Sequence, residues 1–214
     1  MLAGGVASLA TPGASRPDPR YNNGSFKIKR LLISLTKNAP SESGGSNIVF
    51  RQPRTKDGAA IAQLVTDTGV LDANSVYAYL LIAEHFDRTS VVAEVDGQLG
   101  GFISAYCPPD KPDTVFVWQV GVSDKGRGQG LATRMLFEIL LRPACARVSY
   151  LETTISPSNT ASMALFRGLG SKLDTGVVEA ELFAPELFGP GDSHEAEILF
   201  RIGPFSFQSI PDLF

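Results

Sequence analysis

The chain has 214 residues, of which 43% are hydrophobic and 19% are charged, which is enough for one domain of ordinary size with a buried core. This composition excludes a wholly disordered, collagen-like or coiled-coil protein, and no run of about 18 apolar residues predicts a membrane span. A net charge of −3 and a pI of about 5.4 argue against general nucleic-acid binding.

The first 47 residues differ in composition from the rest of the chain. They carry six Lys or Arg against two Asp or Glu, whereas residues 48–214 carry thirteen against twenty. They also contain 17 Gly, Pro or Ser residues. Such a segment buries too little apolar surface to offset its ordering entropy. We therefore expect a flexible extension over 1–47, a folded domain over 48–205 and a short C-terminal tail over 206–214.

The first half of the domain is predicted to alternate between strand and helix. A short strand over 48–51 precedes a helix over 55–66 and a second helix that Asn74 caps. Strands over 90–95 and 98–106 are joined by Asp96-Gly97, a pair typical of two-residue hairpins. The strand that follows, over 114–122, places its apolar even-numbered residues on one face.

The second half continues this alternation. A helix over 131–141 leads to a strand over 148–155, then to a helix over 158–167 that Gly168 and Gly170 are expected to stop, and to a last strand over 196–202. Antiparallel hairpins followed by strand–helix–strand units predict an α/β (α+β) protein with a mixed sheet flanked by helices.

A glycine-rich turn joins the strand over 114–122 to the next helix. Glycines at 126, 128 and 130 let the backbone turn tightly and bring its N–H groups close to a ligand. The helix behind them offers unpaired donors that favour a phosphate, and Arg127 adds positive charge. The turn is neither a Walker loop nor a good Rossmann fingerprint. By itself it predicts an anion site, with a plain structural turn as the alternative.

The residues around this turn resemble the GNAT acetyltransferase superfamily. Arg127-Gly128-Gln129-Gly130-Leu131-Ala132 matches the Arg/Gln-x-x-Gly-x-Gly/Ala motif of that superfamily, and residues 156–166 resemble its Asn-containing strand-to-helix segment. The resemblance implies a mostly antiparallel sheet in which strands 114–122 and 148–155 splay apart to hold acetyl-coenzyme A. The residues it assigns to that ligand are Val120, Val122, Arg127, Gly128, Gln129, Gly130, Leu131, Ala132, Asn159 and Phe166.

A narrower resemblance covers residues 48–205. Residues 70–80, 116–120, 142–145 and 199–205 are similar to those of the L-2,4-diaminobutyrate acetyltransferases of ectoine biosynthesis. This similarity implies acetyl transfer to the side-chain (N4) amine of diaminobutyrate. It also implies a cytoplasmic, metal-free homodimer that binds neither nucleic acid nor membrane.

Diaminobutyrate carries two ammonium groups and one carboxylate, so its pocket should contain acids. The family resemblance assigns Asp72, Tyr77, Trp118, His194 and Glu197 to the substrate. For Asp72 the alternative is a helix cap, and for Tyr77 and Trp118 it is a place in the core. His194 and Glu197 are three residues apart, so they reach one pocket only if the last strand begins after His194.

The substrate amine has a pKa near that of lysine, about 10.4, so the site must remove a proton before the nitrogen can attack. Glu197, Asp72 and Glu152 are the candidate bases, in declining order, and for Glu152 a charge on the sheet surface is an equal alternative. Phe166 stands where many GNAT relatives have a tyrosine that protonates the leaving thiolate. Cys107 and Cys145 have no base beside them in any recognisable motif, which favours direct transfer over an acyl-enzyme.

Two other functions are compatible with parts of this pattern. One is acetylation of another small amine or of a protein N-terminus. The other is a non-catalytic acetyl-coenzyme A sensor, which would lack an intact substrate pocket.

Overall fold

The computed structural model describes residues 46–69, 71, 73–189, 193–206 and 210. The predicted extension over 1–47 and the predicted tail over 206–214 therefore lie almost wholly outside the described residues.

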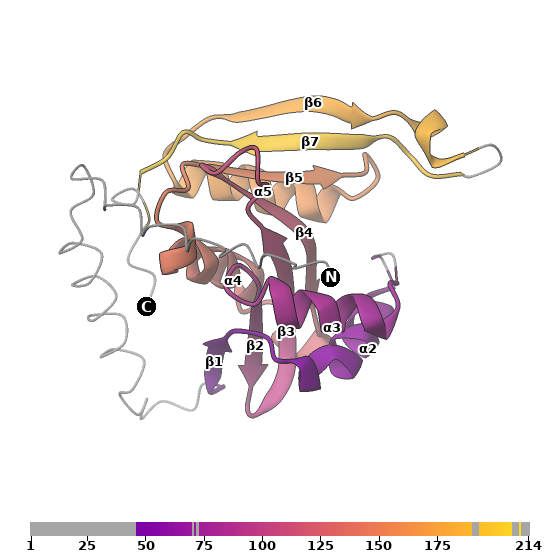
Figure 1. Ribbon diagram of the computed structural model, residues 1–214, viewed down its shortest axis with the longest axis vertical. Coiled ribbons are helices and arrows are strands. Elements are labelled where there is room, and N and C mark those ends of the chain that lie inside the picture. The colour runs from indigo at the N-terminus through magenta and orange to yellow at the C-terminus, as the bar shows by residue number, and fades with distance from the viewer. Residues whose placement is uncertain (1–45, 70, 72, 190–192, 207–209, 211–214) are drawn as a thin grey trace, which may run out of the picture. The chain divides into compact units, whose positions relative to one another are not determined.

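The described strands form one sheet in the order β1-β2-β3-β4-β5-β7-β6 (Figure 1). The pair β4 and β5 is parallel, and the other neighbouring pairs are antiparallel, as the resemblance implied. The strands are β1 Ile48–Arg51, β2 Val91–Val95, β3 Gln98–Tyr106, β4 Thr114–Val122, β5 Tyr150–Ile155, β6 Val177–Phe183 and β7 Glu197–Ile202.

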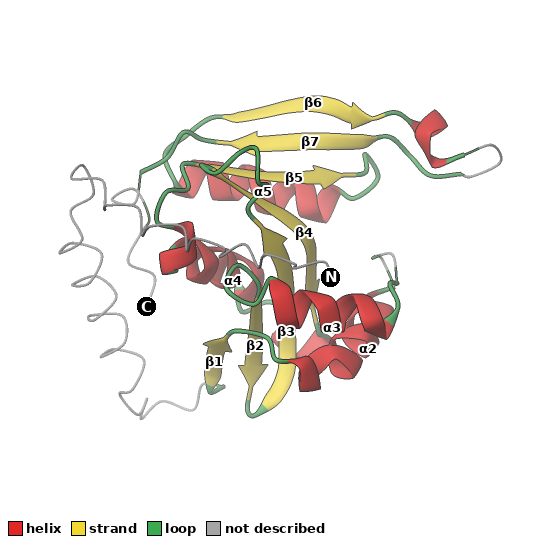
Figure 2. Cartoon of the chain, in the orientation of Figure 1, coloured by secondary structure: helices red, strands yellow, loops and turns green. Residues whose placement is uncertain are grey.

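Helices cover both faces of this sheet (Figure 2). On one face, α2 Gly58–Thr68 and α3 Val76–His85 bury a cluster with Phe102 of β3 at its sheet side. On the other face, α4 Leu131–Leu140 packs on Gly101, where a Cβ atom would lie only 2.8 Å from Met135. The helix α5 Thr160–Lys172 buries Leu169 and continues beside α4 and β7.

The second helix begins one residue later than its predicted cap. Ser75 is the N-cap of α3, and its side chain accepts a hydrogen bond from the Ala78 N–H. The prediction that Asn74 caps this helix is therefore wrong. A serine hydroxyl satisfies one of the N–H groups that the first turn leaves without an internal partner.

Helix α5 runs through both glycines that were expected to stop it. A Cβ atom at Gly170 would lie 2.5 Å from Val177 Cγ2, so this glycine permits a close approach of the helix to β6. The strand β6 itself was not predicted, because Glu179, Ala180 and Glu181, which do not favour a strand, interrupt its strand-favouring Val and Phe residues.

The strands β4 and β5 pair over only part of their length, which creates the predicted split. Their register runs from Thr114 opposite Tyr150 to Val117 opposite Thr153 and goes no further. On its other side β4 contains one extra residue, Trp118, because β3 pairs with Val117 and then with Gln119. Such bulges bend a strand and re-aim side chains beside functional sites.

Candidate functional site

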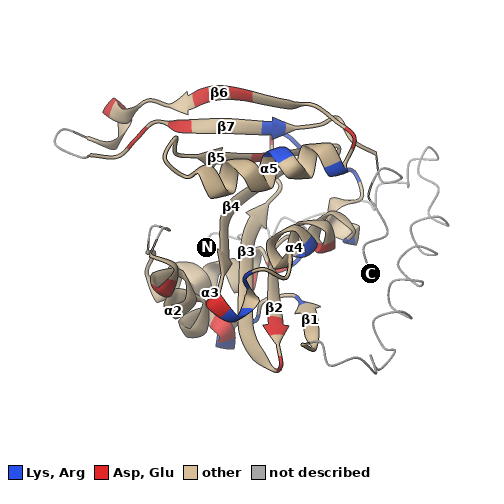
Figure 3. Ribbon diagram, turned by 180° about the vertical axis from the view of Figure 1, so that it is seen from behind, with Lys and Arg blue, Asp and Glu red and all other residues tan. Residues whose placement is uncertain are grey.

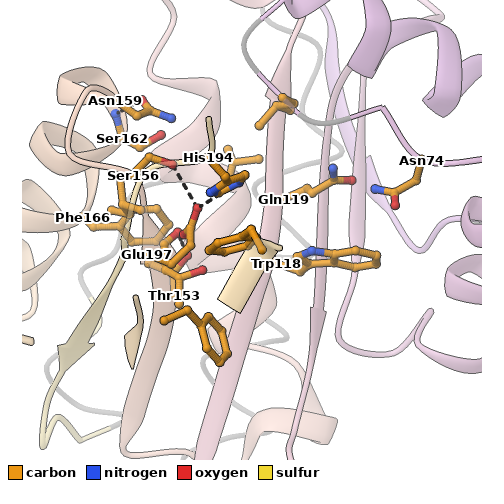
Figure 4. A pocket seen from close by; sticks show the side chains of 16 residues that line it. Asn74, Trp118, Gln119, Thr153, Ser156, Asn159, Ser162, Phe166, His194 and Glu197 are labelled. Carbon is orange, nitrogen blue, oxygen red and sulfur yellow. Dashed lines mark hydrogen bonds and ion pairs between the residues drawn. The ribbon is translucent and has the colours of Figure 1, made fainter. Parts of the chain in front are cut away.

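A cavity of about 350 Å³ opens where β4 and β5 part (Figure 4). Its walls come from β4, from β5 and the loop after it, from α5, and from the segment that connects β6 to β7. The described lining residues are Leu71, Asn74, Trp118, Gln119, Val120, Thr153, Thr154, Ile155, Ser156, Asn159, Ser162, Phe166, Phe183, Phe188, His194 and Glu197.

Glu197 is the acidic centre of this cavity. Its Oε1 accepts a hydrogen bond from the Ser156 hydroxyl at 2.9 Å and lies 3.9 Å from His194 Nε2. The imidazole of His194 stacks on Phe188, with ring centroids 3.8 Å apart, and its Nδ1 donates to the Glu195 carbonyl at 2.8 Å. The ring is therefore held on both sides, with Nε2 directed toward the carboxylate.

Both His194 and Glu197 reach the cavity because β7 begins at Glu197. The residues before it are irregular, so the alternation of a strand does not send His194 to the opposite face. The side chains of His194 and Glu197 are 24% and 17% exposed. This partial burial leaves each group accessible to a small ligand.

The charge of the lining suits a cationic ligand. Among the described lining residues, Glu197 is the only acid and none is Lys or Arg. Figure 3 shows an acidic residue at the start of β7 and a basic residue near its far end. The acidic residue is Glu197, which lines the cavity.

Trp118 lies on the opposite wall from Glu197 in Figure 4. It is 47% exposed, so the alternative of a core tryptophan is wrong. The even-numbered face of β4, which the sequence pattern suggested was uniformly apolar, is the more accessible face, whereas Val115, Val117 and Gln119 are buried. The bulge at Trp118 leaves its indole beside the cavity.

Two of the predicted substrate residues are not placed at the cavity. Tyr77 projects from α3 with 67% of its surface exposed and is not among the described lining residues. Asp72 lies outside the described residues. Its neighbours Leu71 and Asn74 do line the cavity, so the chain on either side of Asp72 reaches this region.

Glu152, which was predicted to be a base or a charge on the sheet surface, lies buried between two cations. Its side chain is 4% exposed on β5 and is not part of the described lining. Its carboxylate pairs with Lys111 Nζ at 3.1 Å and with the Arg201 guanidinium, which stacks on the Tyr150 ring. With both cations beside it, this carboxylate ties β5 to β7 and to the loop before β4.

We expect Glu152→Gln to lower stability while leaving the chemistry intact. The change leaves Arg201 and Lys111 without their anionic partner, and both are partly exposed, so the loss should be about 1–3 kcal/mol rather than the larger cost of a fully buried pair. Urea denaturation measures the loss, and kcat of the folded variant should stay within about twofold. A kcat that falls by orders of magnitude would restore Glu152 as a base candidate.

The glycine-rich turn forms an exposed loop before α4. Gly128 and Gly130 have φ values of 74° and 64°, a region that other residues rarely adopt, and a Cβ atom at either would meet nothing within 4 Å. Gln129 Nε2 donates to the Lys125 carbonyl, and Arg127 pairs with Asp124 at 2.9 Å. Open space above a helix N-terminus fits the anion site that the sequence predicts.

Four of the other residues predicted to bind the coenzyme lie on β4, beside the split, and at the start of α4. Val120 and Val122 lie on the half-buried face of β4. Because the Gln119 N–H donates to Ser104 of β3 at 3.1 Å, strand alternation directs the N–H of Val120 toward the split. Leu131 and Ala132 open α4, with Leu131 buried beneath the loop.

Asn159 and Phe166 line the cavity from α5. Asn159 also has a structural role, because its side chain caps the helix by accepting a hydrogen bond from the Ser162 N–H at 3.1 Å. Phe166 is 2% exposed and forms part of the floor beside Ser156 and Glu197 (Figure 4).

The two cysteines are free thiols that contact each other outside the described lining. The hydrogen bond with Cys107 and burial both raise the pKa of Cys145. Cys145 is therefore a poor nucleophile at neutral pH. The same hydrogen bond lowers the pKa of Cys107, which lies outside the described lining of the cavity. No group of three or more His, Cys, Asp or Glu within the described residues is arranged to hold a metal ion. None of the described helices is both long enough and apolar enough to cross a bilayer.

Sequence reasoning missed several residues of the site. Ser156 lies in the segment 156–166 but was assigned no role from the sequence, although its hydroxyl donates a hydrogen bond to the Glu197 carboxylate. Phe183 and Phe188 come from a segment to which no element was assigned. The apolar Leu182-Phe183 and Leu187-Phe188 pairs were the signal available there.

Comparisons with known proteins show the family to which the chain belongs. The model of the Acetyltransferase (GNAT) family matches residues 60–170, about half of the chain. The chain is 48% identical over 171 residues to the L-2,4-diaminobutyric acid acetyltransferase of Marinococcus halophilus, covering 80% of this chain and 98% of that protein. It is 49% identical over 158 residues to the protein of that name from Bordetella parapertussis, covering 73% and 84% of the two chains.

A solved structure is similar over the same region. The diaminobutyrate acetyltransferase EctA from Paenibacillus lautus, in complex with its substrate L-2,4-diaminobutyric acid and coenzyme A, is 40% identical to the chain with a TM-score of 0.73. The similarity covers 79% of this chain and 100% of that chain.

Proposed function

Because the chain belongs to the Acetyltransferase (GNAT) family and, within it, to the L-2,4-diaminobutyric acid acetyltransferases, we propose that it acetylates the side-chain (N4) amine of L-2,4-diaminobutyrate with acetyl-coenzyme A. The product, N4-acetyl-L-2,4-diaminobutyrate, is the precursor of ectoine, a compatible solute made under osmotic stress. The observation that carries the assignment to this cavity is its single described carboxylate, Glu197, at the split between β4 and β5.

The residues on either side of the split fit acetyl-coenzyme A. The exposed loop at Gly128 and Gly130 leaves room for a pyrophosphate against backbone N–H groups at the start of α4. The free edge of β4 beyond Val117 offers backbone groups to the amides of the pantetheine arm, which would add to the sheet as a short strand does. The N–H of Val120 would then polarise the thioester carbonyl.

Glu197 is the proposed base. The substrate ammonium must lose a proton before its nitrogen carries a lone pair, and Glu197 is the carboxylate that the cavity presents. The neutral nitrogen then attacks the thioester carbonyl directly. No acyl-enzyme is needed, because Cys107 and Cys145 are not among the described lining residues.

Trp118 is proposed to form the wall against the methylene groups of diaminobutyrate, with its indole face available to an ammonium. We propose that Asp72 anchors the α-ammonium and so keeps it away from the thioester. Asp72 lies outside the described residues, and this role rests on the family resemblance and on the position of its neighbours at the cavity.

Trp118 gives a direct optical test of this arrangement. It is the only tryptophan in the chain, so the tryptophan fluorescence of the protein reports on the surroundings of Trp118 alone. Adding diaminobutyrate should change the emission, and Trp118→Ala should raise KM by about tenfold, with Trp118→Phe nearer to wild type. An unchanged KM in Trp118→Ala would place the substrate elsewhere.

We also propose that the enzyme is a cytoplasmic homodimer whose catalytic domain spans residues 48–205. Exposed apolar side chains on α3 and on β6 support association with a second copy, because apolar groups that are gathered on a protein surface commonly mark interfaces. Those on α3 are Val76, Tyr77 and Leu81, and those on β6 and just after it are Val178, Leu182 and Leu187. Light scattering on the purified protein measures the association state.

The experiment that tests the function is an amine panel. Acetyl-coenzyme A is incubated with diaminobutyrate, ornithine, lysine, spermidine or peptides, and free thiol is followed. Diaminobutyrate should give the highest kcat/KM. A preference for another small amine or a peptide would support the alternative acetyltransferase, and binding of acetyl-coenzyme A without thiol release for any amine would support a sensor.

A further inference from the structure

When an ammonium group is acetylated with a single carboxylate as the base, that carboxylate must accept a proton twice in each turnover. The reacting nitrogen loses two protons as it becomes an amide, and the departing sulfur gains one, so one proton is released per turnover. A carboxylate that keeps the first proton cannot accept the second. The site therefore works best if the first proton moves on to the sulfur.

The structure holds a hydroxyl group in position for that transfer. Ser156 follows β5 directly, at the point where the split opens, and its Oγ donates to Glu197 Oε1 at 2.9 Å. Its side chain lies with Phe166 and Glu197 on one side of the cavity, near Asn159, the N-cap residue of α5 (Figure 4). Ser156 thus bridges the substrate side of the cavity and the side assigned to the coenzyme.

Three of the neighbouring groups are less suited to pass a proton. Phe166 has none to give. The hydroxyl of Thr153 donates to a backbone carbonyl of its own strand, at 3.4 Å, rather than to the carboxylate. His194 Nε2 is 3.9 Å from Glu197 Oε1, beyond a direct hydrogen bond.

We propose that the Ser156 hydroxyl relays a proton from Glu197 to the departing thiolate, an inference that rests on the proposed function. Glu197 takes one proton from the ammonium, and the neutral nitrogen forms its bond to the carbonyl carbon. As the carbon–sulfur bond breaks, its electron pair goes to sulfur, which takes the Ser156 proton while Ser156 takes the proton held by Glu197. The regenerated carboxylate then accepts the second proton from nitrogen and releases it to solvent.

The test compares Ser156→Ala with Glu197→Gln over a pH series. Ser156→Ala should lower kcat by about 100-fold, the lower end of the range for proton-transfer catalysis. This loss should persist at alkaline pH, because a neutral amine still loses one proton after it attacks, and that proton still reaches sulfur through Ser156. The loss in Glu197→Gln should shrink at alkaline pH, because hydroxide then removes the first proton. Ser156→Thr, which keeps a hydroxyl, should recover most of kcat.

Ser158→Ala is the matched control, because Ser158 lies in the same loop, is exposed, and is not among the described lining residues. Its kcat should equal that of wild type. The dissociation constant of acetyl-coenzyme A and the melting temperature should be unchanged in Ser156→Ala.

Two results would overturn the relay. An unchanged kcat in Ser156→Ala would show that the hydroxyl takes no part in turnover. A kcat that recovers at alkaline pH in parallel with Glu197→Gln would show that Ser156 only positions the carboxylate. Wild-type protein that releases no thiol with diaminobutyrate would instead contradict the proposed function, so the two failures are distinguishable.

Discussion

Replacing Glu197 with Gln is expected to lower kcat by about 10³-fold at neutral pH, within the range that general-base catalysis contributes. Glutamine keeps the size of the side chain and can still accept from Ser156, but its amide cannot take a proton from an ammonium whose pKa is about 10.4. The variant separates the loss of basicity from the loss of shape. Steady-state kinetics with diaminobutyrate measure the effect.

The direction of the pH dependence follows from the substrate. Raising the pH toward 10 increases the fraction of neutral amine in solution, so the need for a base decreases and Glu197→Gln should regain part of its activity. Glu181→Gln, at an exposed position on β6, makes the same chemical change away from the cavity and should match wild type. Wild-type kcat in Glu197→Gln would remove Glu197 from the mechanism.

The second large effect is expected at the glycine-rich loop. Gly130 has a φ of 64° and forms the N-cap of α4, so Gly130→Val places a β-branched residue in a conformation that it strongly resists. The loop must then change shape, and the backbone N–H groups that would receive a pyrophosphate no longer point to one place. We expect the dissociation constant of acetyl-coenzyme A to rise by about 100-fold, the equivalent of losing one or two charge-assisted hydrogen bonds.

Gly69→Val controls for backbone strain. Gly69 has a nearly identical φ of 65°, and a Cβ atom there also meets nothing within 4 Å, but it ends α2 outside the described lining. Its affinity for acetyl-coenzyme A, measured by calorimetry, should stay near that of wild type. Equal affinity in wild type and Gly130→Val would show that the loop does not hold the pyrophosphate.

Local sequence signals predicted the regular elements well. The Asp96-Gly97 turn has positive φ at both residues, as a tight hairpin turn of this type requires, and β3 and β4 have the predicted bounds. The strand β6 was missed because Glu179, Ala180 and Glu181 interrupt its strand-favouring Val and Phe residues. It forms by antiparallel pairing with β7.

The site was harder to predict because its parts come from distant segments. Glu152 was a reasonable candidate base from the sequence, because it lies on a strand beside the split. Its ion-pair partner Arg201 is 49 residues away, and no local sequence pattern indicated that pair. Ser156 and Glu197 are 41 residues apart, so their hydrogen bond also depends on the fold. Trp118 is exposed because β4 bulges at this residue, and the alternation of side chains along a regular strand does not predict a bulge.

The regiochemistry of the product tests the central claim most directly. Diaminobutyrate offers two amines, and the account places the side-chain nitrogen at Glu197 and the α-ammonium away from the thioester. Incubation with acetyl-coenzyme A followed by NMR of the product should show one species, N4-acetyl-L-2,4-diaminobutyrate, formed in equal amount to free coenzyme A. An N2-acetylated product, a mixture of the two, or no acetylated diaminobutyrate would contradict it.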